Sequence, residues 1–274
     1  MSPTSAAGPP AASKTARAIS VYATQVAAVA AAEVQKLQHD PWELFSRAIQ
    51  PLLWLLLFGE VMARVHGLSS GSTSYLDFLA PGILAQSVLF VAIFYGISAI
   101  WERDLGVLQR YIVSPAPRSA LVSGKAASSC IRALSQAIVV YACAATLGVS
   151  LNFSPAAIAV VVFLIALGSA LFSTFSLIIA CIVKTRERFM GIGQVLTMPI
   201  FFASNAIYPV DLMPRWLKTI AIFNPLTYEV DALRCMMLRD GISVFGIVRD
   251  VTTLALAVVA MMAIATRMLP RMVE

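Results

Sequence analysis

The chain has 274 residues, of which 59% are hydrophobic and only 12% are charged, with four cysteines and a formal net charge of +6. Soluble domains carry about 25% charged residues, so this chain has too little charge to cover a water-soluble fold. Disorder, collagen-like repeats and a disulfide-stapled secreted scaffold are excluded as well. The composition predicts an all-α polytopic membrane protein, whose positive charge belongs to cytoplasmic loops and not to a nucleic-acid site.

The N-terminal part of the chain is expected to lie outside the bilayer core. Residues 1–16 are rich in Ser, Pro, Ala and Gly, which predicts a flexible tail. Within residues 17–40, apolar side chains such as Ile19 and Val26 share one helical face, which predicts an amphipathic helix along the membrane interface. A cleaved signal peptide is the alternative, and the continuation of this stretch into Glu33 argues against it.

Residues 41–271 are expected to form one transmembrane domain, because about 20 apolar residues are enough to cross the hydrocarbon. The interval of 51 residues between Arg132 and Lys184 carries no charge, which requires two crossings joined by a turn. Six spans are therefore predicted, at about 48–63, 78–100, 126–148, 156–183, 189–210 and 249–267. Most Lys and Arg near the span ends fall on one side of the membrane, so both termini are expected in the cytoplasm.

No local pattern indicates catalysis, a metal site or a nucleotide site. The cysteines lie far apart, and the only histidines, His39 and His66, lie outside the spans. Gly124-Lys125 lacks the earlier glycine and the following Ser or Thr of a phosphate loop. The chain is therefore expected not to be an enzyme, to hold no metal or cofactor, and to depend on a separate energy source.

Ionisable residues are almost absent from the predicted spans, which argues against an ion-driven secondary transporter. Glu60 lies near one end of the first span with Arg64 four residues later. This spacing favours a local ion pair, with a proton or substrate site as the alternative.

Two loop segments are the strongest functional candidates. In the cytoplasmic segment 101–118, mixed charges precede apolar residues at helical spacing, and Ser114-Pro115 ends the pattern. A short amphipathic helix of this kind suits docking in a groove on a partner, and a solvated loop is the alternative. In the extracytoplasmic segment 209–241, Asn224-Pro225 breaks one helix and starts an amphipathic second one, which predicts helices that re-enter the bilayer. A surface helix is the alternative for that segment.

These segments resemble the signatures of ABC-2 type transporter permeases. The run E-R-D-L-G-V-L at 102–108, with V-S-P at 113–115 and G-K at 124–125, is similar to the family pattern E-R-E-x-G-T-L…V-T-P…G-K. F-L-A-P-G-I at 78–83 resembles F-L-x-P-G-I, and N-P-L-T-Y at 224–228 resembles N-P-x-x-Y. Asp104, Val107 and Gln109 depart from the pattern, where Glu, Thr and Glu are common. The apolar run 51–59 is most similar to daunorubicin-resistance-type drug exporters, followed by nodulation-type lipo-oligosaccharide exporters.

The resemblance implies a permease subunit in the bacterial cytoplasmic membrane, in contact with membrane lipids and paired with a second permease copy, either the same chain or a paralogue. A separate nucleotide-binding ATPase would hold the ATP and Mg. Residues implied in ATPase coupling are Glu102, Arg103, Asp104, Leu105, Gly106, Leu108, Arg110 and Pro115. The extracytoplasmic motif comprises Asn224, Pro225, Tyr228 and Arg234. A path between the first, second and fifth spans would include Gln86, Phe90, Phe201 and Asn205, although interhelical hydrogen bonds explain the two amides equally well.

The expected function is export of an amphipathic drug-like or lipid-linked molecule. Export of a lipid-linked polysaccharide or lipo-oligosaccharide is the runner-up. A membrane scaffold or a secondary transporter outside the ABC class is the further alternative, because the spans themselves identify no ligand.

Overall fold

The computed structural model describes residues 24, 27, 31, 35, 49–59, 61, 75–106, 118–183 and 185–272. These residues form helices and turns, with an isolated bridge between Leu151 and Leu238. The predicted tail, most of the predicted interfacial helix and the pair of Glu60 with Arg64 lie outside the described residues.

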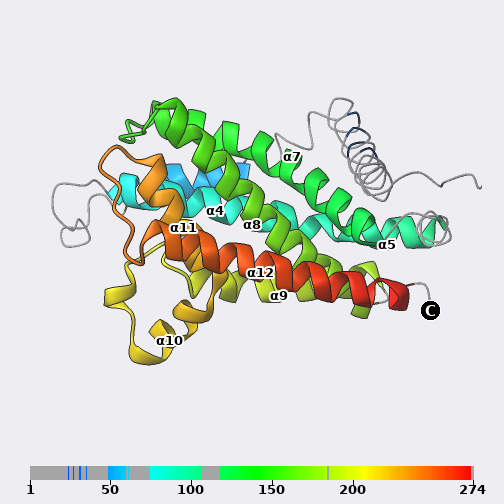
Figure 1. Ribbon diagram of the computed structural model, residues 1–274. Coiled ribbons are helices and arrows are strands. Elements are labelled where there is room, and N and C mark those ends of the chain that lie inside the picture. Colours follow the sequence, from blue (N-terminus) through cyan, green and yellow to red (C-terminus); the bar gives the residue numbers. More distant parts are fainter. Residues whose placement is uncertain are drawn as a thin grey trace, which may run out of the picture.

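The helices are arranged as a bundle with two distinct ends. In chain order they are η1 (Trp54–Phe58), α4 (Tyr75–Tyr95), α5 (Ile97–Asp104), α7 (Arg118–Thr146), α8 (Pro155–Ile182), α9 (Arg186–Phe202), η2 (Val210–Leu212), α10 (Arg215–Phe223), α11 (Pro225–Met237), α12 (Ile247–Met268) and η3 (Leu269–Met272). Helix α8 packs against α4, α7, α11 and α12. The short helices α10 and α11 lie at one end, and α5 lies at the other (Figure 1). We call these the α11 end and the α5 end.

Four segments are long and apolar enough to cross a membrane: Tyr75–Asp104, which joins α4 and α5, Ser119–Thr146, Pro155–Ile182 and Ile247–Met268. They match four of the six predicted spans. The predicted spans 48–63 and 189–210 correspond to a shorter apolar helix, Ile49–Phe58, and to α9 with its 17 residues. The described residues thus form a multi-pass membrane protein with four helices long enough to span the membrane, one shorter apolar helix and the 17-residue α9.

Helix α9 ends earlier than the sequence predicts. It contains Pro199 and ends at Phe202, whereas the predicted fifth span continues to residue 210. Proline supplies no N–H and clashes with the preceding turn, and the chain leaves helical geometry at Ala203. The residues that follow form turns and reach η2 before α10 begins.

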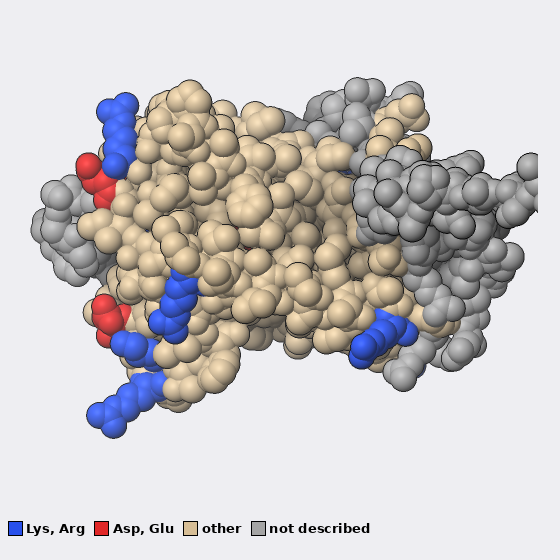
Figure 2. All heavy atoms as spheres, in the orientation of Figure 1, with Lys and Arg blue, Asp and Glu red and all other residues tan. Residues whose placement is uncertain are grey.

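The distribution of charge agrees with a membrane-spanning bundle. On the face shown in Figure 2, Asp and Glu side chains lie at the α11 end, Lys and Arg side chains lie towards both ends, and the band between them is uncharged. An uncharged band with charged ends is what the hydrocarbon core and its two aqueous borders require.

Side-chain caps determine where several helices begin. Ser154 Oγ accepts a hydrogen bond from Ala157 N–H, and Pro155 occupies the first position of α8. Thr185 Oγ1 accepts from Arg188 N–H at the start of α9. Such caps satisfy N–H groups that the first helical turn leaves free. Gly148, at φ 78°, forms the turn between α7 and α8, a conformation that glycine adopts at little cost.

Candidate functional site

The α5 end contains a nearly buried ion pair between two segments of the coupling signature. Lys125 Nζ on α7 lies 2.8 Å from Glu102 Oε2 on α5. The Lys125 side chain is 7% exposed and that of Glu102 is 24% exposed. Because a poorly hydrated ammonium needs a counter-charge, this pair joins the last turn of α5 to α7. The Glu102 carboxylate therefore pairs with a residue of its own chain.

A second, more exposed link joins α5 to α9. Arg186 Nη2 lies 2.8 Å from Asp104 Oδ2, and Arg103 Nη2 lies 3.0 Å from Asp104 Oδ1. The Arg186 guanidinium carbon also lies 3.6 Å from the centre of the Trp101 ring, which is cation–π geometry. Asp104, which stands where the family pattern commonly has glutamate, is thus paired with both Arg103 and Arg186.

The remaining coupling residues are only partly described. Leu105 is 71% exposed just after α5, and Gly106 has φ 70°, in the left-handed region that favours glycine. Leu108, Arg110 and Pro115 lie outside the described residues. Leu105 therefore leaves an apolar side chain at the surface, directly before the turn at Gly106.

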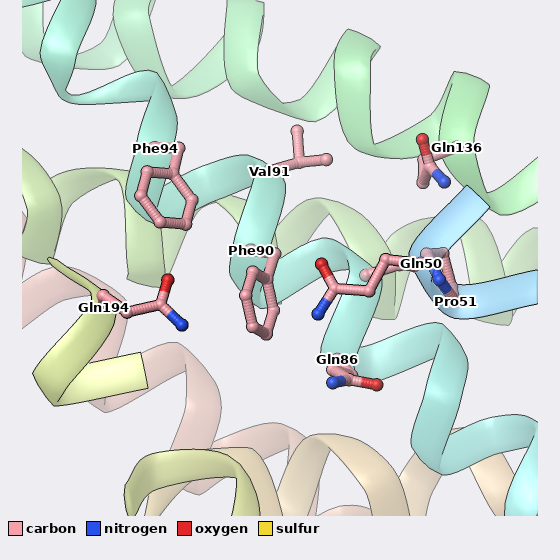
Figure 3. A pocket seen from close by; sticks show the side chains of 9 residues that line it. Gln50, Pro51, Gln86, Phe90, Val91, Phe94, Gln136 and Gln194 are labelled. Atoms are coloured by element: carbon pink, nitrogen blue, oxygen red, sulfur yellow. The ribbon is translucent and has the colours of Figure 1, made fainter. Parts of the chain in front are cut away.

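A cavity of about 320 Å³ lies among the helices and is lined by four glutamines from four helical segments. Gln50 lies in the short helix before η1, Gln86 on α4, Gln136 on α7 and Gln194 on α9. Figure 3 shows the Gln50, Gln86 and Gln194 side chains around the Phe90 ring. The other described residues of the lining are Pro51, Ser87, Phe90, Val91 and Phe94. We call this space the glutamine cavity.

Two of the four carboxamides are buried without a hydrogen-bond partner. Gln86 is 2% exposed and Gln136 is 1% exposed, and neither the Oε1 nor the Nε2 atom of either side chain is paired within the described residues. A buried polar group without a partner costs about 1–3 kcal/mol. Four such atoms beside a cavity of ligand size make this cavity the candidate binding site.

The structure brings together only half of the predicted path. Gln86 and Phe90 line the glutamine cavity, whereas Asn205 and Phe201 do not. Phe201 is fully buried, with its ring 6.1 Å from that of Trp54, and Asn205 is buried in the turn after α9. Sequence reasoning missed the other three glutamines, although a carboxamide next to a run of apolar residues was the available signal.

The predicted motif at the α11 end connects four elements. Asn224 caps α11 by accepting from Leu226 N–H, and its amide donates to the carbonyls of Ile200 (2.6 Å) and Ala203 (3.2 Å) at the end of α9. Tyr228 Oη donates to the Ile222 carbonyl of α10. Pro225 takes the first helical position, where its missing N–H has no cost.

Arg234 completes this connection towards α4. Its Nη2 donates to the Asn205 carbonyl at 2.9 Å, and its guanidinium carbon lies 3.9 Å from the centre of the Phe78 ring. Gly82 permits the contact of α4 with the same turn, because a Cβ atom there would lie 2.3 Å from the Ala206 carbonyl oxygen. We call Asn224, Tyr228 and Arg234 with these partners the α11 clasp.

Further ionisable side chains are buried at the α11 end, which the sequence did not predict. Glu229 is fully buried in α11, a helix too short to cross a membrane, and desolvation raises the pKa of its carboxyl well above the ordinary value. Asp231 and Asp250 both lie next to Ser243, with Oδ2 atoms 2.8 and 2.9 Å from its Oγ. Ser243 has one hydroxyl proton, so it satisfies one of these two carboxyls at a time.

Comparison with known proteins identifies the family. Residues 24–238 match the model of the ABC-2 type transporter family. The chain is 31% identical over 201 residues to the ycf38 transport permease of Cyanophora paradoxa, covering 73% of this chain and 69% of that protein. It is 27% identical to the daunorubicin resistance permease DrrB1 of Streptomyces coeruleorubidus, covering 73% and 70% of the two chains. Nodulation protein J of Rhizobium leguminosarum bv. trifolii is 26% identical, covering 83% and 86%. The chain therefore belongs to the ABC-2 type transporter family and is a transport permease of an ABC transporter.

Proposed function

We propose that this permease exports an amphipathic drug-like or lipid-linked molecule across a bacterial cytoplasmic membrane, driven by ATP hydrolysis in a separate subunit. The α5 end and both termini face the cytoplasm, and a second permease copy, identical or paralogous, completes the path. Similarity to proteins named for daunorubicin resistance and for nodulation supports this direction of transport.

Helices that line the glutamine cavity are also joined by ion pairs at the α5 end, and this relationship is the main support for the proposal. Helix α7 carries both Lys125 and Gln136, and α9 carries both Arg186 and Gln194. Helix α4 carries Gln86 and leads directly into α5 with Glu102 and Asp104. A displacement of the segment after α5 therefore acts on three of the helical segments that line the cavity.

This arrangement gives a physical route from ATP hydrolysis to transport. Closure of the ATPase subunits moves the segment that begins at Leu105, and the pairs of Glu102 with Lys125 and Asp104 with Arg186 transmit that movement. Packed helices shift as rigid bodies between discrete arrangements, so the cavity alternates between two states. The residues of the coupling signature on α5 then act as positioning residues, and the exposed part of the signature contacts the ATPase.

The surface beside the cavity suits the apolar part of an amphipathic molecule. Leu53, Trp54, Leu57, Phe58 and Val61 line a shallow hollow of about 370 Å³ on the helix that also carries Gln50 and Pro51. Burial of such side chains against an alkyl chain contributes about 25 cal/mol per Å². A polar headgroup in the cavity and an apolar tail along this helix match the expected cargo.

Copurification tests the proposal. The full-length chain, tagged and extracted from its native membrane in mild detergent, is expected to bring down an ATPase with a phosphate-loop motif. Export in everted vesicles is expected to stop on ATP depletion and to continue after ionophore addition. Recovery of no ATPase, together with export that ionophores abolish, would identify a secondary transporter instead.

A further inference from the structure

We propose that the glutamine cavity takes an uncharged headgroup rich in hydroxyl and carbonyl groups, of which a sugar is the simplest case, and rejects charged headgroups. The inference deepens the proposed function, since it takes the occupant of the cavity to be the exported molecule.

The four carboxamides define the first requirement of the ligand. Each offers one carbonyl oxygen that accepts and one NH₂ group that donates two hydrogen bonds. The unpaired atoms of Gln86 and Gln136 include both kinds, so the ligand must both donate and accept. Hydroxyl groups do both, and several on one ring can reach carboxamides on different helices.

The lack of charge in the lining defines the second requirement. None of the nine lining residues that the structure describes is acidic or basic. Arg132, one turn before Gln136, is not in the lining, and its guanidinium carbon lies 5.6 Å from the centre of the Tyr95 ring. An ammonium or sulfate headgroup would lose its hydration and find no counter-charge among these residues, which is costly.

The aromatic residues define the third requirement. The Phe90 and Phe94 rings lie one helical turn apart on α4, with centroids 6.1 Å apart and planes inclined by 32°. Both border the space that the carboxamides surround (Figure 3). Aromatic rings offer flat apolar area, and the C–H face of a sugar ring or a planar ring system fits against them. Polar edges and one apolar face therefore describe the headgroup.

Photo-crosslinking of the full-length chain in lipid nanodiscs tests this inference without any ATPase. Three dodecyl probes carry the same diazirine near the headgroup and differ only in that headgroup, which is β-glucoside, trimethylammonium or sulfate. The glucoside is expected to label the peptide that contains Gln86 and Phe90 at least about tenfold more than the charged probes, as the loss of one or two hydrogen bonds implies. Equal or stronger labelling by a charged probe overturns the inference.

Matched variants assign the selectivity to the cavity. Gln86→Met and Gln136→Met keep side-chain length and remove the carboxamide, and each is expected to lower glucoside labelling at least about threefold. Both replace unpaired buried polar atoms, so thermal stability should be kept, and the labelling ratio of the three probes is measured on folded protein. Asn205→Leu, which removes a buried unpaired amide outside the cavity, is the control and should leave labelling unchanged. A loss that is equal in all three variants overturns the inference.

The outcome is separable from that of the proposed function. Glucoside-selective labelling without ATP-driven export of the glucoside would refute the exporter and leave the cavity assignment standing. ATP-driven export with labelling that ignores the headgroup would refute the cavity assignment and leave the exporter standing.

Discussion

The ammonium of Lys125 and the carboxylate of Glu102 lie 2.8 Å apart, with the Lys125 side chain almost completely withdrawn from solvent. This pair fixes the end of α5 to α7, and the Lys125 ammonium has little access to water there. Removing one partner leaves the other poorly compensated, which costs more than the pair itself contributes. The signature proposed to couple the permease to an ATPase thus includes a contact within the permease chain itself.

Charge reversal at this pair is expected to uncouple the transporter. Glu102→Lys places two ammonium groups together and is expected to lower ATP-driven export by about tenfold, equivalent to about 1.4 kcal/mol, while the chain still inserts. The double variant Glu102→Lys with Lys125→Glu restores the attraction and is expected to recover at least half of the activity. Reconstituted vesicles with the ATPase give both rates, and a double variant no better than the single one would show that Glu102 contacts the ATPase directly.

The pair of Asp104 with Arg186 is expected to contribute less. Both side chains are 35% exposed, so water and salt screen their attraction. Asp104→Asn is expected to lower export by less than about twofold at low salt, with no difference left at high ionic strength. Export rates measured across a salt series test this, and a large loss that persists in high salt contradicts it.

The α11 clasp is expected to determine stability. Asn224→Ala removes a helix cap and two amide hydrogen bonds, which together predict a loss of about 2–4 kcal/mol. Asn224→Asp keeps the capping oxygen and loses the two donors, so an intermediate loss is expected. Denaturant unfolding in detergent measures both. Asn152→Ala is the control, because Asn152 caps only Ser154 N–H near the surface.

The buried Glu229 side chain is expected to require a glycine at position 168, because it leaves no room for a Cβ atom there. A Cβ atom at position 168 would lie 2.0 Å from Glu229 Oε1, so Gly168→Ala is expected to cost about 1–3 kcal/mol by overpacking. In a Glu229→Ala background the same substitution should cost much less. Thermal unfolding of the four variants of this cycle measures the coupling. Gly191→Ala, where no neighbouring atom lies within 4 Å of the added Cβ, should be neutral or stabilising.

The proposed orientation predicts which positions a membrane-impermeant maleimide can reach. In a background with all four native cysteines replaced, Asp211→Cys, at a side chain 86% exposed, is expected to react on intact cells. Glu187→Cys, exposed near the start of α9, is expected to react only after permeabilisation. The reverse pattern would invert the topology.

The sequence predicts the long spans well because uncharged intervals of the right length have few alternatives. It misplaces the end of α9, since a helix can end at this place only where another group satisfies the carbonyls that its last turn leaves free. That group is the amide of Asn224, which is distant in sequence. Contacts of this kind are not encoded in the local pattern.

The sequence predicted a residue of the candidate site only where that residue was unusual for its own helix. Gln86 stands out as a carboxamide in an apolar span, but its convergence with Gln136 and Gln194 arises from the packing of α4, α7 and α9. The burial of Glu229 was not predictable, because the nearby Asp231 and Arg234 suggest a polar helical face. In the structure, α11 packs against several helices and is buried on several sides.

The chemistry of the glutamine cavity also has a consequence for the conditions under which the protein works. Carboxamides neither gain nor lose protons between acid and alkaline conditions, and none of the described lining residues supplies a titrating group. The cavity therefore keeps the same polarity whatever the acidity of the surroundings. If the cavity selects the cargo as proposed, this selection stays the same in acid and in alkaline media.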